Sequence, residues 1–206
     1  MAVQLGETTD NRVLVPGVPE SLFDAAQTLT TRAGELESIG TALGRVDTPG
    51  WFGSASGAFW DTFGPEKTNW YVAADALTSA NEAVSGYAET LVWAQSQAQE
   101  AIDLWEQGET ATAQARAAHT ETLTQLRDLG LPDSEVGPFS DPGEDLREQA
   151  RSMLDGARAA LLEAGTTAAA ALRAVSGGDG SAPGWLTTAG DVARDAIDEF
   201  LSLIHI

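Results

Sequence analysis

One seven-residue repeat constrains this chain more than any other feature. A matching series of smaller side chains lies three residues after each member of the main series. Residues that repeat at these a and d positions form a single apolar stripe along a helix. The pattern therefore predicts one long helix that packs lengthwise against another helix. The main series is Trp70, Leu77, Val84, Leu91, Ala98 and Trp105, and the second is Ala73, Ala80, Tyr87, Ala94 and Ala101.

A shorter apolar stripe precedes this repeat and predicts a helix over 19–46. Pro19 suits the first turn of that helix, because the N–H that proline lacks has no partner there. The breaker Asp47-Thr48-Pro49-Gly50 follows it. The large residues of the stripe, which we expect to pack on Trp70, Leu77, Val84 and Leu91, are Leu22, Leu29, Leu36 and Leu43.

The second helical pattern begins at Ser54, after Trp51-Phe52-Gly53. We expect Gly64-Pro65 to kink or break this helix, since proline removes an internal hydrogen bond. Gly108 is a candidate for its end, and a weaker pattern from Ala111 to Leu126 either continues the same helix or begins another.

A loop and a further helix follow. Residues 130–143 contain three prolines and three glycines, which is typical of a loop. Asp141 is placed to cap a helix whose first position is Pro142 and whose third is Glu144. An apolar stripe over 144–175 then predicts a helix that covers the long helix around Tyr87 to Trp105. No strand-like alternation occurs, so the predicted fold class is all-α.

These patterns divide the chain into four parts. Residues 1–129 are predicted to form a helical hairpin, and 130–175 a loop and packing helix of the same module. Residues 176–200 are interpreted as a Gly/Ser linker and the start of a truncated downstream region. Residues 201–206 match the translation of the mosaic-end adaptor of transposase-based sequencing libraries, so we expect them to be non-native and the chain to be a fragment.

Composition narrows the possible functions. The formal net charge is −20, which repels phosphates and anionic lipids and argues against nucleic-acid partners. The chain has no cysteine, so disulfides, thiolate chemistry and zinc knuckles are excluded. Met1 to Asp10 has neither the basic nor the apolar region of a Sec-type signal peptide. No run approaches the ~20 apolar residues of a membrane span, so stable membrane insertion is not expected.

A search for chemistry finds no catalytic, cofactor-binding or metal-binding set. His119 stands in a polar helix without a partnering motif, and the glycine-rich stretch 176–181 lacks the lysine of a phosphate loop. Tryptophans at 60, 70, 93 and 105 are more typical of packing or partner contacts than of a cofactor site. The chain is therefore predicted not to be an enzyme and to need no cofactor.

Several motifs together carry a family resemblance. Trp51-Phe52-Gly53 between two periodic helices resembles the WxG superfamily of type VII secretion substrates, in which Gly53 would permit an unusual backbone and Trp51 would cover the seam. A wider series is similar to the type VII secretion-signal domain at the N-terminus of actinobacterial polymorphic toxins. That series spans roughly 4–129 and consists of 5–10, 14–17, 47–51, the Phe59 and Phe63 pair, and 73–77, with 183–186 also typical.

The resemblance implies a function and partners. It implies a non-catalytic module that directs export of a larger effector without a Sec signal peptide, so that the protein is secreted. The implied partners are a small WxG-type helical protein, or self-association, and the membrane ATPase of the secretion system. The alternative is a structural coiled-coil or scaffold protein, for example phage-related, without a secretion role.

The resemblance also implies an export signal of the form Tyr-x-x-x-Asp/Glu. Tyr71 and Asp75 match it, and their spacing places both on one helix face. They lie inside the predicted seam rather than at a helix end, so Tyr71 could equally be a packing aromatic. Tyr87 is nearer the expected place but is followed by Leu91 at the fourth position.

Overall fold

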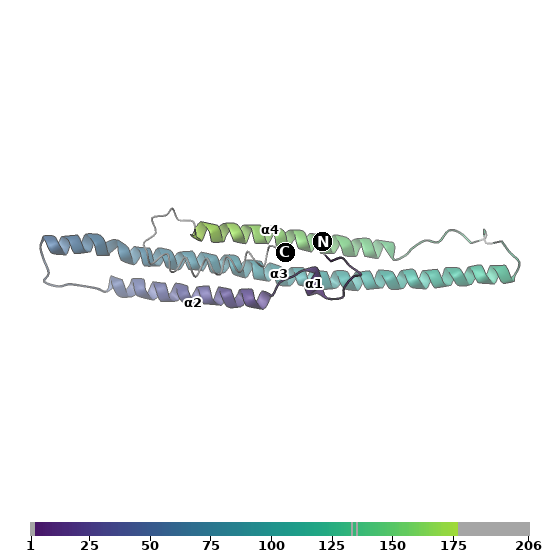
Figure 1. Ribbon diagram of the computed structural model, residues 1–206, viewed down its shortest axis with the longest axis horizontal. Helices are drawn as coiled ribbons and strands as arrows, with labels where there is room; N and C mark the ends of the chain where they lie inside the picture. The colour runs from purple at the N-terminus through teal and green to yellow at the C-terminus, as the bar shows by residue number, and fades with distance from the viewer. Residues whose placement is uncertain (1–2, 133, 135, 177–206) are drawn as a thin grey trace. The chain divides into compact units, whose positions relative to one another are not determined.

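A computed structural model describes residues 3–132, 134 and 136–176, apart from the side chains of Val175 and Ser176. Within these residues the chain forms four helices and no strand, which confirms the all-α prediction (Figure 1). The only extended pairing among them is an isolated bridge between Leu5 and Thr8. The helices are α1 (Asn11–Leu14), α2 (Pro19–Gly44), α3 (Ser54–Asp128) and α4 (Glu144–Ser176).

The starts of three helices follow local sequence signals. α2 begins at Pro19, and α3 begins at Ser54, directly after Gly53, as predicted. α4 is preceded by Asp141, whose Oδ1 accepts a hydrogen bond of 2.9 Å from the Gly143 N–H. This bond satisfies an N–H that the helix itself cannot pair, which is the role predicted for Asp141.

The long helix α3 corrects two expectations. It runs unbroken through Gly64-Pro65 and through Gly108, and the weaker pattern after Ala111 continues the same helix. A proline inside a helix costs roughly 3 kcal/mol, so the contacts on either side of Pro65 outweigh that cost. The absence of a side chain at Gly108 serves a close helix contact, described below, and not a helix end.

The described residues form two compact units. The first contains 3–17 and 91–161, and the second contains 18–90 and 162–176. Thus α3 and α4 each contribute to both units. The division into 1–129 and 130–175 stays a prediction, and the parts predicted over 177–200 and 201–206 lie outside the described residues.

In the second unit, α2 lies alongside α3 (Figure 1). Leu22, Leu29, Leu77 and Val84 are buried, each burial contributing roughly 1.5–3 kcal/mol. Leu36, Leu43 and Trp70 are half-buried. The predicted apolar stripes thus face inward, whereas the family-type hairpin with a WxG turn stays a prediction.

In the first unit, the N-terminal segment (residues 3–17) is part of the core. Leu14 is 2% exposed and Val15 is 1% exposed. Gln95 on α3 donates from Nε2 to the carbonyls of Val15 (3.1 Å) and Gly17 (3.0 Å). Arg158 on α4 donates to the carbonyl of Leu14 at 3.0 Å. Side chains of two helices therefore hold the main chain of this segment.

Candidate functional site

The connection between α2 and α3 presents aromatic side chains to solvent. Gly50 and Gly53 adopt φ angles of +83° and +106°, which a side chain would strain, so the predicted need for glycine at 53 is met. Phe52 is 86% exposed and Trp51 is 41% exposed. Trp51 does not stand alone, since its ring centroid lies 5.3 Å from that of Phe59 in the second turn of α3.

Three rings of α3 extend this contact. Phe59 and Phe63 are stacked with centroids 5.0 Å apart, and Trp60 meets both edge-on at 5.1 and 5.6 Å. We call Trp51, Phe59, Trp60 and Phe63 the aromatic cluster. The three helical members are half-buried rather than buried. Contiguous exposed apolar surface of this kind is typical of protein–protein interaction sites.

Tyr71 and Asp75 line one groove of about 340 Å³ between α2 and α3, together with Glu37 from α2. The predicted placement on one helix face is therefore correct. Trp51 does not line this groove. Whether the export machinery reads any of these residues stays a prediction.

The two residues differ in what they contact. The Tyr71 hydroxyl lies 3.1 Å from the Thr41 hydroxyl, and its ring leaves only 3.2 Å for a Cβ at Gly40. Tyr71 thus serves as a packing residue between α2 and α3, which was the alternative interpretation. Asp75 is exposed on the rim. Tyr87 is buried, and that burial raises its pKa.

A buried arginine in the first unit was missed by sequence reasoning. The side chain of Arg147 is only 9% exposed and bridges α3 to the start of α4. It pairs with Asp141 at 2.6 Å, Glu144 at 2.9 Å and Glu109 at 3.2 Å. It also donates to the Thr112 hydroxyl at 2.7 Å. The spacing of Asp141, Glu144 and Arg147 was the visible signal, but their partners on α3 were not.

This cluster sits where the two helices approach most closely. A Cβ at Gly143 would collide with the Gly108 carbonyl oxygen, and one at Gly108 would lie 2.8 Å from the Gly143 carbonyl oxygen. Both positions therefore require glycine for a backbone-to-backbone approach. The arrangement holds a helix junction together and offers no reacting group.

Asp141 provides a pH prediction. Mainly through the hydrogen bond from Thr112 (2.5 Å), and also through Arg147 and the Gly143 N–H, the pKa of Asp141 falls to about 2 from an ordinary 3.8. A lowered pKa stabilises the fold above the ordinary pKa, and that contribution is lost as the pH falls towards 2. The stability difference between the wild type and Asp141→Asn should stay constant above about pH 5 and shrink below about pH 4.

Urea unfolding of both proteins across this pH range measures the difference, and a carboxyl NMR titration gives the Asp141 midpoint directly. Thr112→Val removes the largest cause and should raise that midpoint towards 3.8. An unchanged midpoint in Thr112→Val would contradict the assignment.

Among the residues that the structure describes, no helix is long and apolar enough to cross a membrane. The same residues contain no group of three or more histidine, cysteine or carboxylate side chains suited to a metal ion. His119 instead contacts the ring of Phe139, with centroids 5.7 Å apart.

Comparison with known families decides the classification. The family model described as "Putative T7SS secretion signal domain" matches residues 2–183. The chain belongs to this family. The match covers the N-terminal segment, all four helices and both units of the signal domain. No curated protein and no solved structure matched the chain.

Membership supports a secretion-targeting role for this signal domain and agrees with the resemblance drawn from its motifs. It bears on the function of the whole matched region and singles out no residue. The structure adds that the motif segments 5–10 and 14–17 belong to the docked N-terminal segment, while 47–51 and 59–63 surround the aromatic cluster.

Proposed function

We propose that this T7SS signal domain directs the export of a larger effector through a type VII secretion system and has no catalytic role itself. The observation that carries the proposal is the family match over residues 2–183. The motif order along the chain and the exposed aromatic cluster support it. Nothing favours the alternative of a scaffold protein.

The aromatic cluster is the proposed contact surface for the secretion machinery. Its rings rest on one another, so Trp51 is presented in a defined position despite the glycine-rich connection. Aromatic side chains that are held rigid lose little entropy on binding, which suits them as interface anchors. The proposed partners are a small WxG-type helical protein, or a second copy of the chain, and the membrane ATPase.

Asp75 is the second proposed contact. Its carboxylate is exposed on the groove rim, where a partner can reach it, whereas the Tyr71 side chain is engaged with Thr41 and Gly40. In this proposal Tyr71 acts through the position of α2 against α3. Replacing Tyr71 by phenylalanine keeps the ring and removes only one hydrogen bond, worth about 1 kcal/mol.

The decisive experiment measures secretion of the tagged chain from a type VII-competent host with and without the membrane ATPase. We expect the chain in the culture supernatant only when the ATPase is present. A cytoplasmic marker protein controls for lysis. Equal supernatant levels in both strains would refute the proposal.

Variants then test the surface. Trp51→Ala and Asp75→Ala should each reduce export about tenfold or more, in keeping with the loss of an interface anchor. Trp93→Ala and Asp24→Ala are matched controls, because both residues are exposed and lie outside the cluster and the groove. Tyr71→Phe should be exported normally. Full export of Trp51→Ala and Asp75→Ala would leave ATPase-dependent export standing but overturn these contact residues.

A further inference from the structure

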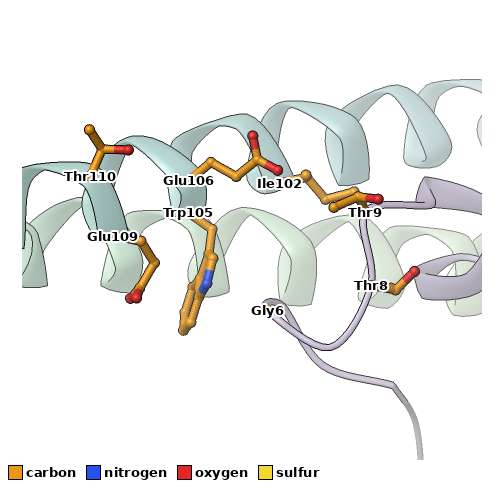
Figure 2. A pocket seen from close by; sticks show the side chains of 8 residues that line it. All are labelled: Gly6, Thr8, Thr9, Ile102, Trp105, Glu106, Glu109 and Thr110. Carbon is orange, nitrogen blue, oxygen red and sulfur yellow. The ribbon is translucent and has the colours of Figure 1, made fainter. Parts of the chain in front are cut away.

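A cleft of about 410 Å³ lies in the first unit, between the N-terminal segment and α3 (Figure 2). The α3 side is formed by Trp105, Glu106, Glu109 and Thr110, which share one helix face with the buried Ile102. The opposite side is the turn of the N-terminal segment. Neither side belongs to the aromatic cluster or to the groove of Tyr71 and Asp75.

Gly6 fixes the width of this cleft. Its φ of +86° turns the N-terminal segment, and a Cβ there would lie 3.0 Å from the Trp105 Nε1. The segment therefore runs close to the indole and brings Thr8 and Thr9 to the rim (Figure 2). Because Leu14 and Val15 are buried and Gln95 and Arg158 hold the main chain, the position of this rim is defined.

The lining has the chemistry of a cation receptor. It contains two carboxylates, three threonine hydroxyls and an indole, and no cationic side chain. Glu109 is already paired with Arg147. Glu106 forms no ion pair among the described residues, and Figure 2 shows its carboxylate directed towards the side of the cleft where Thr9 lies. An anionic ligand would be repelled here.

The same helix turns already bind guanidinium groups within the molecule. The guanidinium of Arg151 lies 5.2 Å from the ring centroid of Trp105. That of Arg147 is held by a glutamate and a threonine of α3, Glu109 and Thr112. Glu106 and Thr110 repeat this pairing of a carboxylate and a hydroxyl on the cleft side of α3.

We propose that this cleft binds an arginine side chain from a basic segment of a protein partner. A guanidinium is planar and always charged, and it can meet a carboxylate while lying against an aromatic ring. The ammonium of lysine lacks this flat shape. The net charge of −20 would draw a basic segment towards the domain. This site is independent of the proposed export function.

A short peptide with one arginine, Ac-Gly-Arg-Gly-NH2, is the probe. The ¹⁵N-labelled signal domain is titrated with it, and the indole signal of Trp105, assigned by its loss in Trp105→Phe, reports occupancy. We expect a saturable shift of this signal. The same peptide with citrulline, which keeps the shape but has no charge, should leave it unmoved. A peptide with lysine should bind more weakly.

Two glutamates provide matched variants. Glu106→Gln should weaken arginine-peptide binding by about fivefold, the upper end for a solvent-exposed ion pair. Glu148→Gln removes the same charge from an exposed position on α4 outside the cleft, and its effect should stay below about twofold. No shift at the highest soluble peptide concentration, equal binding of the citrulline or lysine peptide, or equal loss in both variants would overturn the proposal.

Discussion

Leu14→Ala is expected to lower the free energy of unfolding by about 3 kcal/mol, within the usual range for emptying a leucine site in a core. Leu14 is 2% exposed, and its neighbour Val15 is 1% exposed. The loss is expected to be large because the segment is held otherwise only by hydrogen bonds to its main chain. Urea unfolding followed by circular dichroism measures it.

Val13→Ala is the matched control for this substitution. Val13 belongs to the same short helix α1 but is 43% exposed, so its truncation should change stability by no more than about 0.5 kcal/mol. In Leu14→Ala the N-terminal segment should also become sensitive to protease. Equal stability of the two variants would mean that the segment is not part of the cooperative core.

Gly143→Ala should also be strongly destabilising, by about 3 kcal/mol, the upper part of the range for overpacking a close contact. The added Cβ would collide with the Gly108 carbonyl oxygen and the Thr112 hydroxyl. Since Gly108 lies inside a continuous helix, its backbone cannot move aside without disturbing that helix. The start of α4 must therefore shift, which also disturbs the pairing of Arg147 with Asp141.

Gly156→Ala, further along α4, should have the opposite effect. A Cβ at Gly156 meets nothing within 4 Å. Alanine is favoured over glycine inside a helix by roughly 0.5–1 kcal/mol, so this variant should gain stability. Denaturant midpoints of the two glycine variants should thus move in opposite directions. A destabilised Gly156→Ala, or an unaffected Gly143→Ala, would contradict the assigned helix contact.

Local signals were sufficient for the helix boundaries, but not for the length of α3. Pro19 and Asp141 act through their own neighbouring backbone, so their sequence context shows where α2 and α4 begin. Pro65 and Gly108 also carry local signals, but contacts with distant segments override them. At Gly108 the decisive neighbour is Gly143, which no short-range pattern reveals.

The same distinction applies to the sites. Helical periodicity alone placed Tyr71 and Asp75 on one face. It could not show that Thr41 and Gly40 occupy the Tyr71 side chain, because these residues come from another helix. Arg147 was missed for the same reason, since Glu109 and Thr112 on α3 complete its surroundings.

The grip on the N-terminal segment has a consequence for the order of events on the ribosome. Residues 3–17 emerge first, yet Arg158, which binds the carbonyls of Val3 and Leu14, is separated from them by 155 and 144 residues. Closing such distant contacts is slow, because the entropy of a long loop is lost before the contact forms. The earliest-made residues of the chain must therefore wait for the middle of α4 before they can dock. A half-synthesised chain thus exposes a segment that the finished domain keeps buried.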